Sequence, residues 1–153
     1  ISIGQGLNLK KSFIVKEATR NKFIFLKNNH LIPFMTSEDG APFVLKKTKN
    51  FIVDGSQLKP DQIQELKRAG IDIFRREATT KSEPILIMPR GVSRHFCANN
   101  TVGAYSSSGV DVYCDKEALP EEIRLNLWLF LNSSAAWLIR EFTGKPRWRI
   151  AKS

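Results

Sequence analysis

The sequence predicts an α+β fold, with a mixed, mostly antiparallel sheet packed on one long C-terminal core helix plus a peripheral helix. Residues 119–143 are apolar around nearly the whole circumference of a helix, which is typical of a buried one. Short apolar runs separated by turn residues predict strands. A chain of 153 residues, 42% of them hydrophobic, suffices for one core and is short for two. We therefore expect a single domain over residues 1–153.

The core helix is predicted from its ends as well as from its hydrophobicity. Pro120 and Glu121 suit a first helical turn, and Gly144 suits the position just after a helix. The polar step at 132–134 predicts a kink or break near Asn132. No uncharged run here reaches the roughly 18 residues that a membrane span needs, since Arg124 and Arg140 bound it. We therefore expect a buried helix around which the other elements pack, and no membrane partner.

The remaining elements are read in chain order. A peripheral helix is predicted over 58–69, because Pro60 and Asp61 begin it and Gly70 ends it. The apolar run 84–89, bracketed by prolines, predicts a strand buried on both faces. Further strands are expected over 12–15, 43–45, 51–53 and 71–74, and as a strand–turn–strand unit within 96–114.

Charge is the composition feature that bears most directly on function. Twenty-four Lys and Arg against fifteen Asp and Glu give a net charge of +9. This balance favours a polyanionic partner, with nucleic acid first and an anionic membrane surface second; a soluble domain with incidental charge is the alternative. The two cysteines do not form a disulfide framework, so we expect a reducing, cytoplasmic setting. Both ends of the chain resemble cuts through a longer protein.

Four basic clusters are the candidate DNA contacts, because phosphates are bound by Lys, Arg and backbone N–H groups. The cluster at 46–49 is either a solvated hairpin tip or a phosphate-contacting loop. Arg90, Arg94 and His95 follow a buried strand, and such a rigid support suits a guanidinium that reads guanine. The candidates are Lys46, Lys47 and Lys49; Arg75 and Arg76 with Lys81; Arg90, Arg94 and His95; and Arg147 with Lys145 and Arg149.

Motifs for catalysis are not recognisable in this sequence. Cys97, Cys114, His30 and His95 are the only soft metal ligands, without a C-x-x-C pair, and a buried cysteine is the simpler interpretation of Cys97. A serine nucleophile elbow is missing. We therefore predict no catalytic residue, no metal site and no cofactor in this chain.

Several segments together resemble the TaqI-like C-terminal specificity domain, the target-recognition domain of adenine-specific DNA methyltransferases and related restriction–modification enzymes. Residues 4–8, leading to Phe13-Ile14-Val15, are similar to the family's glycine turn and Phe-led strand. Residues 29–34 (NHLIPF) resemble its "hLIkP" step, and 51–53 its next strand. Pro89-Arg90-Gly91 resembles the segment before the second part of the sheet. The best match is LFLNSS at 129–134, which is similar to the family's "LLNS" step.

The resemblance implies a non-catalytic module that reads double-stranded DNA beside a covalently attached methyltransferase domain. That domain would supply S-adenosylmethionine and the base-flipping chemistry. Gln5 departs from the family pattern, where Thr is frequent, and the helix at 58–69 does not align with the family. Two alternatives remain open from the residues: an unrecognised metal-dependent nuclease, and a basic protein-interaction module.

Overall fold

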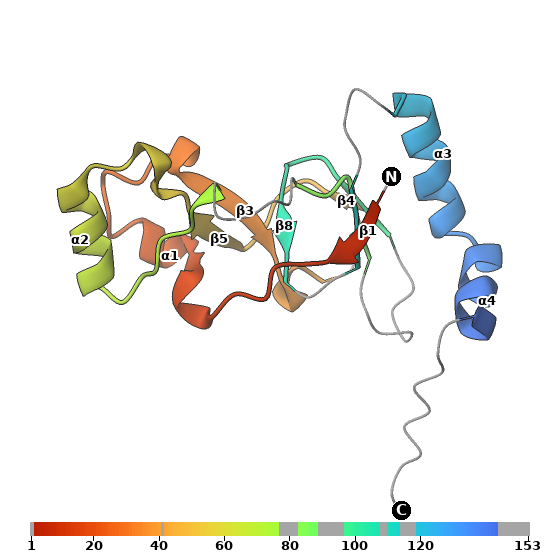
Figure 1. The fold of residues 1–153 in the computed structure, drawn as a ribbon, viewed down its shortest axis with the longest axis horizontal. Coiled ribbons are helices and arrows are strands. Elements are labelled where there is room, and N and C mark those ends of the chain that lie inside the picture. The colour runs from red at the N-terminus through yellow and green to blue at the C-terminus, as the bar shows by residue number, and fades with distance from the viewer. Residues whose placement is uncertain are drawn as a thin grey trace, which may run out of the picture.

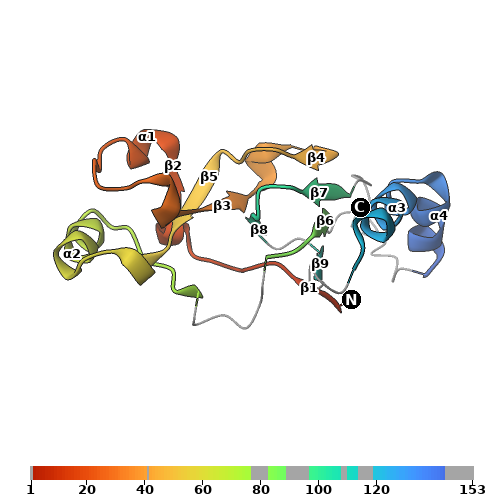
Figure 2. The ribbon, with the colours of Figure 1, turned by 90° about the horizontal axis from the view of Figure 1, so that it is seen from above.

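The chain is elongated, with two sheets in the middle and helices at both ends (Figure 1, Figure 2). A computed structural model describes residues 2–40, 42–76, 83–88, 97–107, 110–113 and 119–143. Helix α2 (Pro60–Arg68) lies at one end, and helices α3 (Glu121–Leu131) and α4 (Ser134–Thr143) lie at the other. The short helix α1 (Glu17–Arg20) follows the first strand of the second sheet. The predicted α+β class is confirmed.

The first sheet has five strands in the order β1-β9-β6-β7-β4. Its neighbours are antiparallel except β4 and β7, which pair in parallel with Val44 opposite Asn99. The strand bounds are Ser2–Gln5 (β1), Val44–Leu45 (β4), Leu86–Met88 (β6), Ala98–Asn100 (β7) and Val110–Tyr113 (β9).

The second sheet has four strands in the order β2-β5-β3-β8. Strand β5 lies antiparallel to both β2 and β3, whereas β3 and β8 are parallel, with Phe34 opposite Tyr105. The strand bounds are Ile14–Lys16 (β2), Leu31–Met35 (β3), Asn50–Val53 (β5) and Tyr105–Ser106 (β8). The predicted mixed, mostly antiparallel pairing of strands is therefore confirmed. The strands form two sheets, however, where the sequence predicts one.

Strand β3 contributes to three apolar clusters, which explains why nearly all its side chains are buried. Leu31 packs with Val53 and Leu66 under α2, and Phe34 packs with Ile52 on the opposite face of the second sheet. At the end of the strand Met35 enters a cluster of the first sheet with Leu45, Ile87 and Ala98. Successive strand residues point to opposite faces, so this apolar run serves a two-sided core.

Strand β6 confirms the prediction of a strand buried on both faces within 84–89. Leu86 packs toward α3 with Ile85 and Cys97, and Ile87 packs on the other side with Met35. The helix predicted over 58–69 is also confirmed as α2, with Pro60 at its start and Gly70 at φ 79° just beyond its end. A residue without Cβ is favoured at such a positive φ.

A hairpin at residues 46–50, one of the two interpretations of this basic connection, is not formed. Strand β4 belongs to the first sheet and β5 to the second, so the connection between them crosses from one sheet to the other. Two short apolar runs joined by polar residues suggest a hairpin because adjacent strands usually pair. Here each strand has a partner from elsewhere in the chain, with β4 beside β7 and β5 beside β2 and β3.

The prediction of one long core helix at 119–143 is not confirmed, whereas its predicted break near Asn132 is present. The segment breaks near Asn132 into α3 and α4, as the polar step indicated. The two helices also flank the first sheet rather than occupy a core. Ala136 is the only apolar residue of this pair that is buried among the described side chains. Hydrophobicity on all sides does not distinguish a buried helix from one that keeps an apolar face exposed.

Asn132 attaches α3 to the first sheet, because its side-chain amide forms hydrogen bonds with backbone groups just before β7. Its Oδ1 accepts a hydrogen bond from the Cys97 backbone N–H at 2.8 Å, and its Nδ2 donates to the Cys97 carbonyl at 2.9 Å. Trp128 Nε1 donates to the same carbonyl at 2.8 Å. Backbone groups that would otherwise lack a partner at the start of β7 are thus satisfied by one amide and one indole. Leu127 and Leu131 pack around these contacts.

The same amide also ends the helix. Asn132 Nδ2 donates to the Trp128 carbonyl at 2.9 Å, and the same carbonyl accepts the Asn132 backbone N–H at 3.2 Å. Ser133 then opens α4, because its Oγ accepts from the Ala136 N–H at 3.2 Å.

None of the described helices is both long and apolar enough to cross a lipid bilayer.

Replacing Asn132 with Ala should destabilise the protein by about 2 kcal/mol, because the Cys97 N–H loses its acceptor and is partly shielded from water. Urea unfolding followed by circular dichroism measures the change. Asn126→Ala is the matched control, since Asn126 is exposed on the same helix. Equal effects of the two substitutions would show that the amide does not anchor α3.

Candidate nucleic-acid interface

In the lysine loop, residues 46–49, the three lysines are exposed to solvent and the threonine is buried. Lys46, Lys47 and Lys49 are exposed, whereas Thr48 is 8% exposed and its Oγ1 donates to the Asn50 carbonyl at 2.8 Å. Because the loop joins β4 to β5, both its ends are held by strands of different sheets. Three cations are thus presented on a connection that is anchored at its centre.

Asp39 fixes the backbone of the lysine loop. Its Oδ1 accepts from the Lys49 backbone N–H at 2.7 Å, and its Oδ2 accepts from the Thr36 backbone N–H at 2.8 Å. Asp39 ends the 3-10 turn η3 (Ser37–Asp39), which Thr36 caps. The Asn50 side chain adds a 2.9 Å hydrogen bond from Nδ2 to Thr36 Oγ1. The carboxylate therefore ties the loop to β3 through backbone atoms and leaves the Lys49 ammonium to solvent.

The lysine loop borders an open hollow of about 450 Å³. Its other lining residues include Glu17, Pro42 and Val44. None of the ion pairs within the described residues involves Lys46, Lys47 or Lys49. Lysines without a carboxylate partner can neutralise an external anion without first breaking a protein ion pair.

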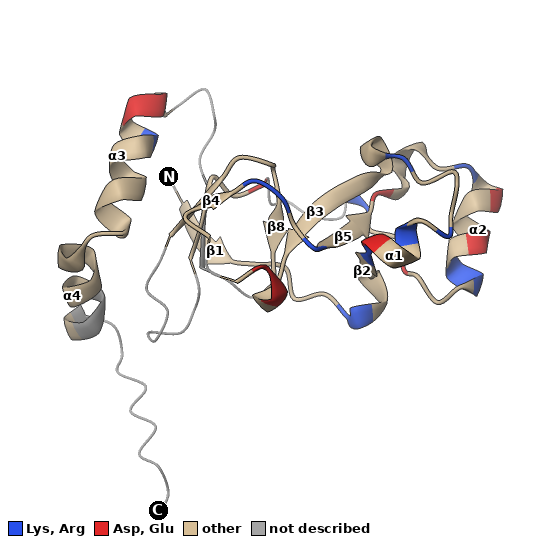
Figure 3. Cartoon of the chain, turned by 180° about the vertical axis from the view of Figure 1, so that it is seen from behind, with Lys and Arg blue, Asp and Glu red and all other residues tan. Residues whose placement is uncertain are grey.

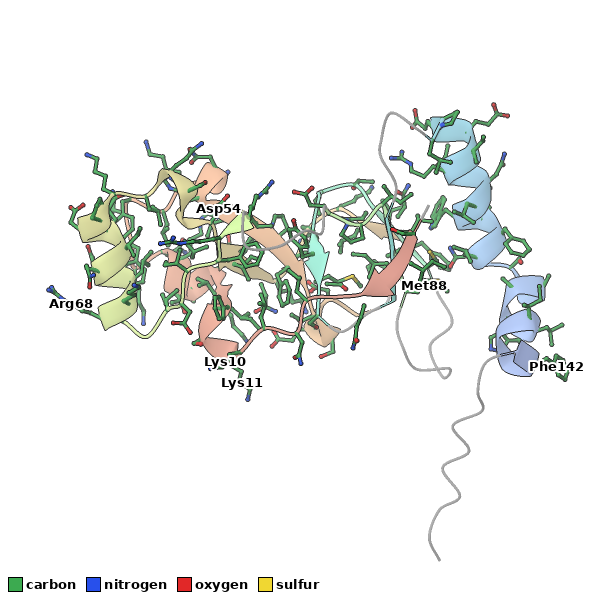
Figure 4. All side chains as sticks on the ribbon, viewed as in Figure 1. Lys10, Lys11, Asp54, Arg68, Met88 and Phe142 are labelled. Atoms are coloured by element: carbon green, nitrogen blue, oxygen red, sulfur yellow. The ribbon has the colours of Figure 1, made fainter. Side chains whose placement is uncertain are left out.

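A second hollow of about 420 Å³ is lined by residues of β2, η3 and the turn before β2. Its lining includes Lys11 and Lys16, which are not among the contacts predicted from the sequence. Lys16 is engaged, since its Nζ lies 3.0 Å from Glu38 Oε1. The hydrogen bond and charge of Lys16 lower the pKa of Glu38 below its usual value. Lys11 lines this hollow, and both Lys10 and Lys11 project from the surface (Figure 4). The adjacent lysines at 10–11 were the sequence signal for this group.

Arg75 and Arg76 lie at the other end of β5. Phe74 pairs with Asp54, the residue just after β5, whereas the lysine loop precedes Asn50. At about 3.3 Å per strand residue the two groups are separated by about 13 Å of backbone. The two basic groups therefore lie at opposite ends of β5 and form separate parts of any interface.

Arg76 is partly committed to the protein itself. Its guanidinium lies 3.4 Å from Asp54 Oδ2 and 2.9 Å from Glu83 Oε1. Arg75 is exposed and borders a smaller hollow with Gly55 and Ser56. A Cβ at Gly55 would collide with the Ile73 side chain, so glycine is required for this close approach. Of the two arginines, Arg75 is the freer candidate for an external anion.

The other predicted contacts, Arg90, Arg94, His95 and Arg147, lie outside the described residues, as do Lys81, Lys145 and Arg149. Their role as DNA contacts stays a prediction. The strand expected to carry the cluster at 90–95 is present as β6, which ends at Met88.

Positive charge is concentrated in one half of the molecule. Residues 1–76 contain fourteen Lys and Arg and seven Asp and Glu, whereas residues 77–153 contain ten and eight. Figure 3 shows the basic positions over the β2–β5–β3 sheet and α2, while the described parts of α3 and α4 are almost free of them. Among the described residues, the basic side chains are therefore unevenly distributed and gather on the second sheet, α1 and α2.

Metal ligands do not converge in the described part of the chain. No group of three or more His, Cys, Asp or Glu residues there could hold an ion. Cys97 is fully buried, and His30 Nδ1 accepts from the Lys27 backbone N–H at 3.2 Å. His95 and Cys114, the other proposed ligands, lie outside the described residues.

No protein-family model matches this chain, and no curated protein matches its sequence. The resemblance to the methyltransferase specificity domain therefore depends on the residues quoted for it. The geometry of the lysine loop is independent of that resemblance.

We expect Cys97 to be unreactive in the folded protein, because burial raises the pKa of its thiol to about 12. At about pH 8 its thiolate fraction should be about a thousandfold lower than that of an ordinary cysteine. Iodoacetamide labelling followed by peptide mass mapping reports Cys97 separately from Cys114. Labelling in urea is the control; equal rates in native and denatured protein would contradict the buried environment.

Proposed function

We propose that this chain is a DNA-binding module, the target-recognition domain that works beside an adenine-specific DNA methyltransferase domain. The observation that carries the DNA-binding part is the lysine loop, where three exposed lysines, which form no ion pair within the described residues, stand on a backbone held by Asp39. The methyltransferase part rests on the residue resemblance alone. S-adenosylmethionine and the catalytic residues belong, in this proposal, to the attached domain.

The fixed backbone is what favours phosphate binding over incidental charge. A disordered basic loop loses conformational entropy when it binds, which weakens the complex. The lysine loop has already lost most of that freedom through Asp39 and Thr48. Only the lysine side chains need to be ordered by a phosphate. Counterion release from DNA then supplies the favourable free energy.

The positions of the basic residues favour two different roles, phosphate contact and base reading. In this proposal Lys46, Lys47, Lys49 and Arg75 contact phosphates and set the orientation of the module. Sequence reading is assigned to Arg90, Arg94 and His95, because a guanidinium held after a buried strand suits the O6 and N7 atoms of guanine. Phosphate contacts position a protein on DNA, and base contacts specify the sequence.

Removing the three lysines together should reduce both the affinity for duplex DNA and its salt dependence. Each lost phosphate contact lowers the slope of log K against log salt by about 0.9, so K46A/K47A/K49A should lower it by up to about 2.7. Fluorescence anisotropy over a salt series measures the slope.

A charge-matched control variant is available on α2. K59A/K67A/R68A removes the same three charges from exposed positions at the far end of the molecule. We expect it to keep most of the slope. An equal loss in both triple variants would indicate non-specific attraction, and undetectable duplex binding by the unaltered chain would reject the proposed function.

Arg90→Ala should relax the preference for one base pair and cost about 1–3 kcal/mol on the preferred sequence only. Binding to a randomised duplex library, followed by sequencing, measures the preference at each position. A uniform loss over all sequences would instead assign Arg90 to a phosphate.

A further inference from the structure

Helices α3 and α4 carry most of the exposed apolar surface of the described chain. Seven of its ten exposed large hydrophobic residues are in these two helices; Ile3, Ile24 and Phe43 are the others. We propose that this surface is the interface between two copies of this chain. Six residues define the apolar face: Ile123, Leu129, Phe130, Trp137, Leu138 and Phe142.

The apolar face is separate from the side of α3 that packs against the first sheet. Leu127, Trp128 and Leu131 pack on Ile85, Leu86 and Cys97, which satisfies the side turned to the sheet. Ile123 and Phe130 are seven residues apart, and Leu138 and Phe142 are four apart, so each pair forms a helical stripe. Phe142 is 85% exposed and points away from both sheets at the end of α4 (Figure 4).

The size of the apolar face fits a dimer. Large apolar side chains present about 150–250 Å² each, so the exposed fractions here, from 42% to 85%, amount to an area on the order of 700 Å². A stable interface buries about 800 Å² on each partner, whereas apolar patches on monomers are usually about 300–600 Å². In a two-fold dimer each copy supplies the same patch, so the partner is matched in area and polarity.

The charge of α3 and α4 themselves does not oppose contact at this end. Two copies at +9 repel one another, but most Lys and Arg of the described residues lie on the second sheet, α1 and α2, away from α3 and α4 (Figure 3). Residues 121–143 contain three acidic and two basic residues, a net charge of −1. Repulsion between the basic halves is screened beyond about 8 Å at physiological salt. Contact through α3 and α4 keeps those halves apart.

An anionic membrane fits this surface less well. Helices that lie on membranes carry Lys and Arg on the polar side of the apolar face. Here α3 begins with Glu121 and Glu122, both exposed, and the two helices together carry Arg124, which lies 3.5 Å from Glu121, and Arg140 against three Glu. Those carboxylates would be repelled by anionic lipid.

Sedimentation velocity on the full chain, from roughly 1 to 100 µM, tests the proposal. The unaltered chain should form a dimer as concentration rises. Phe142→Glu and Leu129→Glu should each raise the dimer dissociation constant by about a hundredfold or more, since a carboxylate would be buried in an apolar interface. Both side chains are mainly exposed, so circular dichroism and the urea midpoint should match those of the unaltered chain.

Ile24→Glu is the matched control, because Ile24 is 96% exposed and lies in the other half of the chain. It should leave the dimer intact. A chain that stays monomeric at the highest concentration overturns the proposal, including the case in which it binds lipid vesicles or another protein instead. Equal weakening by Ile24→Glu, or no weakening by Phe142→Glu, would also overturn it.

Discussion

The amide of Asn132 is the contact on which the arrangement at one end of the molecule depends. It satisfies both backbone groups of Cys97 and a last-turn carbonyl of α3. The helix pair buries few side chains against the sheet, so hydrophobic packing alone holds its position weakly. Hydrogen bonds with fixed directions define where α3 ends, where α4 begins and how both meet β7. The polar residues at 132–134 are thus the feature that fixes the position of this apolar helical segment on the sheet.

A second constraint connects the two sheets. Strand β3 enters clusters on both sides of the second sheet and reaches the first sheet through Met35. The lysine loop also connects the two sheets, because it runs from β4 in the first sheet to β5 in the second. Asp39, in the turn after β3, accepts a hydrogen bond from the loop backbone. The loop is therefore held where the two sheets meet. Its basic side chains occupy a position that the core itself determines.

The two ends of the molecule differ in chemistry. The half built on β2, β3, β5 and α2 carries the excess positive charge, and the α3–α4 end carries the exposed apolar face. Electrostatic attraction acts over several ångströms and is screened by salt, whereas apolar contact requires direct burial. Two different kinds of partner, a polyanion and an apolar surface, suit the two ends. The proposals for DNA binding and for self-association use these ends separately.

The sequence by itself determined the α+β class, the helix α2, the buried strand β6 and the break near Asn132. These features depend on local periodicity, capping residues and turn residues, which act over a few positions. It also indicated the lysine loop as a basic site. Only the tertiary structure decided that there are two sheets, that Lys46–Lys49 joins them, and that α3 and α4 keep an apolar face exposed. Strand pairing and burial depend on partners distant in the chain, and no local pattern identifies those partners.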